Sequence, residues 1–145
     1  MKDEVVLISA CLCGINCKYN GENNYNNKIE NLLKSKKCIP VCAEQLGGLT
    51  TPRCPAEIKY INGIRKVITK EGKDVTENYE KGAKEIVNFA KSMNINKIIL
   101  KSKSPSCGVG KIYNGEFNGT LIDGNGILTD LCIKNNIEVI NIDEY

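Results

Sequence analysis

The stretch VTENYEKGAKEIVNFAKSMNINKIILKS, residues 75–102, decides the fold because it combines a helix pattern with a strand pattern. Its first part predicts an amphipathic helix over 75–94, with Thr76 as the N-cap. The apolar stripe of this helix consists of Tyr79, Ala83, Ile86, Val87 and Ala90. The run INKIILKS (95–102) is short, apolar and β-branched, which predicts a buried strand.

The alternation of strands and helices continues on both sides of this stretch. Further strands are predicted at 4–10, 38–42 and 137–142, and further helices at 26–37 and 126–136. We therefore expect one α/β domain over residues 1–145, with a mainly parallel, Rossmann-like sheet flanked by helices.

Two segments depart from this alternation. Residues 58–69 contain two β-like runs joined by Asn62-Gly63, which predicts a small β-hairpin insertion. Residues 44–58 are punctuated by Gly and Pro, so we expect a functional loop there.

Length, charge and hydropathy argue against several classes of protein, including nucleic-acid-binding and membrane-spanning proteins. The chain has 145 residues, which suits one domain with one core. Its net charge is only +3, and Arg53 and Arg65 are its only arginines, which argues against a nucleic-acid polymer as partner. No apolar run is long enough to predict a membrane span, and the N-terminal residues do not follow the signal-peptide pattern. We expect a cytoplasmic protein, and the sequence leaves its oligomeric state open.

Cysteine content is the unusual feature of the composition. The chain has 8 cysteines and no histidine. A disulfide framework is not expected in a reducing compartment, so metal binding or thiol chemistry is the better interpretation. The absence of histidine excludes a Cys-His dyad and a Cys/His zinc finger. Thiolate ligands select zinc, Cu(I) or iron–sulfur clusters.

Three of the cysteines directly follow predicted strands. Cys11 follows 4–10, Cys42 ends 38–42, and Cys107 lies in the loop SPSCGVG after 95–102, which has no large apolar residue to bury it. Ligands of parallel sheets bind beyond the carboxyl ends of the strands, so we expect the three thiols to converge. Three thiolates can hold a metal centre with an open position, whereas structural zinc takes four ligands. Nearby hydroxyls and backbone N–H groups that could surround such a centre belong to Ser104, Ser106, Gly108 and Gly110.

The other cysteines have different interpretations. Cys132 and Cys38 are expected to be core residues, and Cys54 is an ambiguous loop thiol. The cluster CLCGINC (11–17) leaves a second ligand set open, because Cys11, Cys13 and Cys17 could supply three ligands by themselves. With Cys107 or Cys42 they could make a closed four-thiolate zinc site.

Three segments together resemble the thiouracil desulfidase family. They are ISACLCGINCKYNG (8–21), PVCAEQLGGLTTPRCPAEI (40–58) and LKSKSPSCGVGKIYNGEFNGTLIDGNGILTDLC (100–132). The resemblance implies a [4Fe–4S] cluster held by Cys11, Cys42 and Cys107, with a free fourth iron. It also implies hydrolytic, non-redox removal of sulfur from a small thiolated pyrimidine, with release of hydrogen sulfide.

The implied chemistry requires proton transfer near the cluster. Glu44 is the candidate acid/base, because a chain without histidine must use a carboxylate or a lysine. Ser104 is expected to position substrate or water, and Lys101 to orient a substrate carbonyl. Ser106 and Gly108 are predicted to contact the substrate, whereas Glu57 and Asn20-Gly21 are expected only to shape the pocket. The alternatives are a non-catalytic zinc-thiolate protein and an iron–sulfur protein that carries sulfide.

Overall fold

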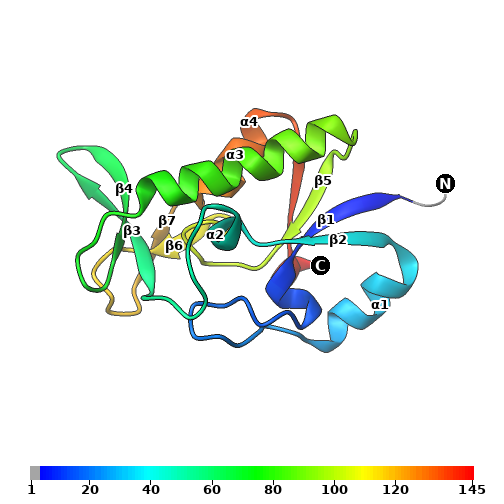
Figure 1. The fold of residues 1–145 in the computed structure, drawn as a ribbon, viewed down its shortest axis with the longest axis horizontal. Helices are drawn as coiled ribbons and strands as arrows, with labels where there is room; N and C mark the ends of the chain where they lie inside the picture. The colour runs from blue at the N-terminus through cyan, green and yellow to red at the C-terminus, as the bar shows by residue number, and fades with distance from the viewer. Residues whose placement is uncertain (1–3) are drawn as a thin grey trace.

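The computed structural model describes residues 4–145, and its core is one four-stranded parallel sheet (Figure 1). The strand order is β2-β1-β5-β8. The bounds of these strands are Val5–Ser9 for β1, Lys37–Val41 for β2, Lys97–Leu100 for β5 and Glu138–Asn141 for β8. The predicted α/β domain with a mainly parallel sheet is confirmed. No helix within the described residues is long and apolar enough to cross a membrane.

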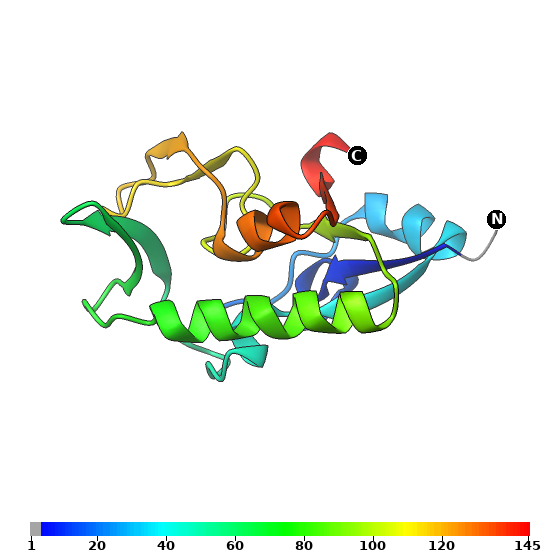
Figure 2. The same ribbon diagram turned by 90° about the horizontal axis from the view of Figure 1, so that it is seen from above.

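Helices cover both faces of the sheet (Figure 2). Val6 and Ile8 of β1 pack on the face covered by α1 (Asn27–Ser35). Leu7, between them, points to the other face, which α3 (Thr76–Ser92) and α4 (Ile127–Lys134) cover. Successive side chains of a strand point to opposite faces of the sheet. When helices cover both faces, every residue of the strand is therefore expected to be apolar. The uninterrupted apolar run in β1 thus reflects burial on both sides.

The strand order creates a topological switch point between β1 and β5. The chain leaves β1 toward α1 and β2 on one side, and it leaves β5 toward α4 and β8 on the other. The two connections therefore diverge and leave a crevice at the carboxyl ends of β1 and β5. A short 3₁₀ helix, η1 (Ala10–Cys13), carries Cys11 from the end of β1, and the loop with Cys107 follows β5.

Two antiparallel hairpins lie beyond one end of the parallel sheet (Figure 1). The first pairs β3 (Ala56–Ile61) with β4 (Ile64–Thr69), and Asn62 (φ 52°) and Gly63 (φ 78°) form its turn. Positive φ at both positions is the geometry that Asn-Gly favours, so the predicted hairpin is confirmed. The second pairs β6 (Lys111–Tyr113) with β7 (Leu121–Asp123).

The start of α3 corrects one prediction. Thr76 is the first helical residue rather than the N-cap. The N-cap is Val75, whose apolar side chain cannot accept a hydrogen bond from the backbone N–H groups at the helix start. The Thr76 hydroxyl instead accepts a hydrogen bond from the backbone N–H of Val67, at 2.9 Å. Asp74 Oδ1 accepts from the backbone N–H of Thr76, also at 2.9 Å. The threonine therefore ties the helix to β4, and the neighbouring aspartate satisfies the helix start.

The predicted loop 44–58 is loop only in its central part, because α2 (Ala43–Leu46) extends into its start and β3 begins at Ala56. Two glycines allow α2 to pack backbone to backbone on α3. A Cβ added to Gly82 would lie 1.9 Å from the carbonyl oxygen of Ala43, and one added to Gly47 would lie 1.9 Å from that of Asn78. This close approach fixes α2, and with it the side chains of Cys42 and Glu44.

Candidate functional site

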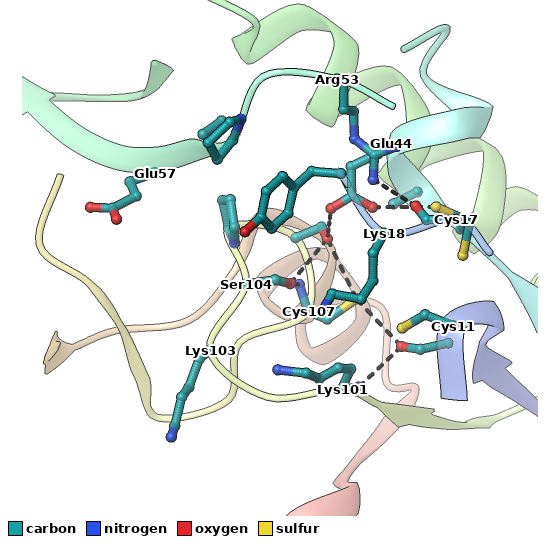
Figure 3. A pocket seen from close by; sticks show the side chains of 18 of the residues that line it. Cys11, Cys17, Lys18, Glu44, Arg53, Glu57, Lys101, Lys103, Ser104 and Cys107 are labelled. Atoms are coloured by element: carbon teal, nitrogen blue, oxygen red, sulfur yellow. Dashed lines mark hydrogen bonds between the residues drawn. The ribbon is translucent and has the colours of Figure 1, made fainter. Parts of the chain in front are cut away.

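A cavity of about 560 Å³ opens at the carboxyl ends of β1, β2 and β5 (Figure 3). The two hairpins contribute residues to its far side, including Glu57 and Tyr113. Cys11, Cys42 and Cys107 all line this cavity, which is the convergence that the strand ends predict. The edge at which parallel strands end is where open α/β sheets bind ligands.

Ser9, the last residue of β1, joins two of the strand ends. Its hydroxyl donates to the Cys107 sulfur at 3.5 Å and accepts from the backbone N–H of Lys101 at 3.1 Å. The Cys107 loop is thereby held against the end of β1. Asn24 Nδ2 donates to the Cys11 sulfur at 3.3 Å, so Cys11 also receives a hydrogen bond from the segment that precedes α1.

Cys107 corrects the expectation of an unburied loop thiol. Only 9% of the residue is exposed, and it belongs to the core cluster that includes Ile112 and Leu128. The apolar neighbours come from other segments rather than from the loop itself. Burial, followed by the charge of Glu44, raises the pKa of the Cys107 thiol to about 12. A cationic metal centre would offset this preference for the protonated form.

Glu44 joins the loops that follow β2 and β5. Its Oε2 accepts a 2.7 Å hydrogen bond from the Ser106 hydroxyl, and its Oε1 accepts from the Cys42 thiol at 3.5 Å. The Ser104 hydroxyl lies 3.3 Å from that of Ser106 and accepts from the backbone N–H of Cys107 at 2.8 Å. The structure thus brings the predicted acid/base and both predicted serines into one hydrogen-bonded group beside the thiols.

Cys17 is a fourth thiol in the cavity, and it is 2% exposed. Its thiol is the main influence that lowers the pKa of the Cys11 thiol to about 7 and that lowers the pKa of Cys42. Cys11 and Cys42 in turn raise the pKa of Cys17 itself. Arg53 fixes the Cys17 backbone, since its Nη2 donates to the Cys17 carbonyl at 2.9 Å.

Of the remaining residues predicted at the site, two line the cavity and one does not. Lys101 and Glu57 line the cavity. Lys101 Nζ donates to the carbonyl of Ser102 at 3.0 Å, and Glu57 Oε1 accepts from the backbone N–H of Gly115 at 2.9 Å. Gly108 is not among the lining residues, and its N–H donates to the Ser104 carbonyl at 2.9 Å. A Cβ on Gly108 would lie 2.7 Å from Ile112 Cγ2, so this glycine serves the tight packing of the loop.

The other cysteines lie in three environments. Cys54 lines the cavity and is half-buried, whereas Cys132 is fully buried in the core, as predicted. Cys13 and Cys38 pack against the core on the α1 side of the sheet. Cys38 is only half-buried there, because β2 is an edge strand, and this corrects its assignment to the core.

The donor chemistry of the cavity fits an iron–sulfur cluster. Three thiols from separate segments, each beyond a strand end, line one cavity, and two of them have lowered pKa values that favour the thiolate form. Among residues 4–145, no group of three or more cysteine, histidine or carboxylate side chains is arranged to hold a metal ion directly. The fit therefore rests on the donor types and on their shared cavity.

Tyr79 is a cavity residue that the sequence pattern did not reveal. It belongs to the apolar stripe of α3 and is 4% exposed, as a core residue would be, yet it lines the cavity. Burial and then the charge of Glu44 raise its pKa well above the usual value, so the phenol stays protonated. Helical periodicity places the residue on the buried face but does not distinguish packing from ligand contact.

The chain resembles known proteins over nearly its whole length. A family model described as 2-thiouracil desulfurase matches residues 6–144. The uncharacterized protein YbbK of Bacillus subtilis (strain 168) is 44% identical over 146 residues, which cover 97% of this chain and 97% of YbbK. The solved structure of the [4Fe-4S]-dependent thiouracil desulfidase TudS is 36% identical, with a TM-score of 0.87, and the match covers 98% of this chain and 93% of that one. The similarity therefore includes every segment that lines the cavity.

Proposed function

Because the chain belongs to the 2-thiouracil desulfurase family, we propose that it removes sulfur hydrolytically from a small thiolated pyrimidine and depends on a [4Fe–4S] cluster. The observation that carries this proposal is the shared cavity of Cys11, Cys42 and Cys107, with Glu44 hydrogen-bonded at its wall. In the overall reaction, the C=S group and one water become C=O and hydrogen sulfide. No electrons are transferred, so no external oxidant or reductant is needed.

The three strand-end cysteines would hold the cluster. When bound, a cluster with three protein ligands supplies an open iron, a Lewis acid for the thiocarbonyl sulfur. Ser9 donates a hydrogen bond to the Cys107 sulfur at 3.5 Å, and Asn24 donates to that of Cys11. Such donors orient ligand thiolates and stabilise their charge. The Ser106 oxygen lies 3.4 Å from the Cys107 sulfur, but its proton is donated to Glu44.

Glu44 is the proton-transfer group in this proposal. Its carboxylate would take a proton from the attacking water and return it to the leaving sulfur, and no imidazole is present to do so. The Ser106 hydroxyl at 2.7 Å holds the carboxylate toward the cavity. Ser104 would position water or substrate, and the Lys101 ammonium would stabilise negative charge that develops on the ring.

The proposed setting is the cytoplasm, with a free small molecule as substrate and no nucleic-acid polymer or membrane as partner. The eight free cysteines support a reducing compartment. The low net charge of +3 supports a small molecule over a polymer.

Turnover of 2-thiouracil in ¹⁸O-labelled water tests the proposal. The protein is reconstituted with iron and sulfide without oxygen and is then given 2-thiouracil. Uracil and hydrogen sulfide in equal amounts, with one ¹⁸O atom in each uracil, are expected. Uracil without the label would exclude direct hydrolysis, and no uracil from a fully loaded protein would refute the proposed function.

A further inference from the structure

We propose, as an inference that rests on the proposed function, that Tyr79 is a substrate-binding residue whose hydroxyl donates a hydrogen bond to the carbonyl oxygen of the thiolated pyrimidine. Substrates with one thiocarbonyl and one carbonyl group would then be preferred over rings that lack the carbonyl. Three observations support the inference: the phenol lines the cavity, its hydroxyl has no hydrogen-bond partner within residues 4–145, and the polar side chains around it already have partners.

The phenol of Tyr79 lies inside the cavity. The side chain extends from the first turn of α3, and the residue is 4% exposed. Glu44, Arg53, Cys42 and Cys107 line the same cavity, so the phenol shares it with the proposed acid/base and the thiols. A substrate held between Cys107 and Glu44 would therefore come within reach of the Tyr79 hydroxyl.

The Tyr79 hydroxyl has no hydrogen-bond partner among residues 4–145. It is also not fully enclosed, because Thr129 Oγ1 is the one fully buried side-chain oxygen or nitrogen without a partner in the described part of the chain. The hydroxyl therefore opens on the cavity and is free to donate. Tyrosine hydroxyls in protein interiors normally find a partner, and a ligand can supply it here.

The neighbouring polar side chains are already engaged within the protein. Glu44 accepts from Ser106, and Ser104 accepts from the backbone of Cys107. Arg53 donates to the carbonyls of Thr50 and Cys17. Tyr79 thus differs from them as a buried neutral donor that is still unpaired.

An unpaired buried donor selects among ligands. A ring that covers the hydroxyl without accepting its proton leaves a polar group with neither water nor partner, which is unfavourable. A ring with a carbonyl oxygen at that point satisfies the group. Sites of this kind discriminate more strongly than apolar pockets do.

Tyr79→Phe in the cluster-loaded enzyme tests the inference, with Tyr60→Phe as the matched control because Tyr60 is 58% exposed. We expect Tyr79→Phe to keep its iron and its melting temperature, since no intramolecular hydrogen bond is lost. The KM for 2-thiouracil and the inhibition constant of uracil are expected to rise about tenfold. The KM for 2,4-dithiouracil, which has no carbonyl, is expected not to rise in Tyr79→Phe and to fall where this ring leaves the hydroxyl unpaired in the unaltered enzyme. Tyr60→Phe is expected to match the unaltered enzyme throughout.

Two results would overturn the inference. One is an unchanged KM and an unchanged uracil inhibition constant in Tyr79→Phe, and the other is a loss of iron or of melting temperature that makes the hydroxyl a structural group. If the unaltered, fully loaded enzyme does not convert 2-thiouracil, the proposed function fails and the inference fails with it. If it converts 2-thiouracil and Tyr79→Phe behaves identically, only the inference fails.

Discussion

Ser106 donates a 2.7 Å hydrogen bond from its hydroxyl to Oε2 of Glu44, which joins the loop after β5 to the short helix after β2. The same Ser106 hydroxyl lies 3.4 Å from the sulfur of Cys107. One serine thus contacts both the proposed proton-transfer group and a proposed cluster ligand. In the proposed mechanism, this single side chain links the acid/base group to a cluster ligand.

Glu44→Gln is expected to separate proton transfer from cluster binding. The amide keeps the size of the side chain and can still accept from Ser106, but it cannot take a proton. We expect a full complement of iron and a fall in kcat of about 10² to 10⁴-fold. Glu71→Gln, on an exposed turn, serves as the control. Wild-type turnover in Glu44→Gln would remove this residue from the mechanism.

The iron content of the cysteine variants is expected to depend on whether the substituted residue is a proposed cluster ligand. Cys107→Ala, Cys11→Ala and Cys42→Ala remove proposed ligands, so iron should fall from about four per chain to near zero. Cys13→Ala, at a thiol that does not line the cavity, should keep its iron. Iron and acid-labile sulfide analysis after anaerobic reconstitution measures this.

Cys17→Ser decides between the open and the closed ligand set. Cys17 contacts both Cys11 and Cys42, so it is the strongest competitor for a ligand position. With three strand-end ligands, Cys17→Ser retains the cluster. If Cys17→Ser loses its iron and Cys107→Ala remains fully loaded, the third ligand is Cys17 and not Cys107.

Gly82→Ala is expected to destabilise the fold and to displace α2. The added methyl group would lie 1.9 Å from the carbonyl oxygen of Ala43, and two backbones cannot relax as a flexible side chain can. We expect a loss of roughly 1–3 kcal/mol in the free energy of unfolding, as for overpacked sites. Urea denaturation measures it, and Lys84→Ala on the exposed side of the same helix should change it by less than about 0.5 kcal/mol.

Glu4 is expected to contribute to the pH dependence of stability. Hydrogen bonds from Lys36 and then Lys97 lower the pKa of its carboxyl from 4.5 to about 2. A lowered folded-state pKa stabilises the protein above the ordinary pKa, and this contribution is lost as pH falls from 4.5 toward 2. Glu4→Gln should therefore be less stable than the unaltered chain at pH 6, and the difference should vanish near pH 2. Denaturation midpoints that differ equally at both pH values would contradict this origin.

The sequence predicts the sheet and its edge well because both depend on local signals. Continuous apolar runs mark strands that are buried on both faces, and Asn62-Gly63 marks a turn with two positive φ angles. The position of Cys11, Cys42 and Cys107 after three such runs was enough to predict a common edge. In a parallel sheet, the carboxyl ends of the strands lie at the same edge, so residues that follow different strands come close together.

Features that depend on distant contacts were not predictable in this way. The apolar neighbours that bury Cys107 come from residues such as Ile112 and Leu128, in other segments. Helix α2 is four residues long, has no side-chain cap, and is held by packing on Gly82 rather than by propensity. The phenol of Tyr79 follows the helical period of a core residue, and only the structure shows that it opens on the cavity.

The Mössbauer spectrum of the ⁵⁷Fe-reconstituted protein, recorded with and without 2-thiouracil, tests the central claim most directly. A cluster held by three cysteines has one iron that differs from the other three, and addition of 2-thiouracil should change the signal of that iron alone. Four iron signals that stay the same with and without 2-thiouracil would contradict the account, as would one tightly bound zinc and no uptake of iron.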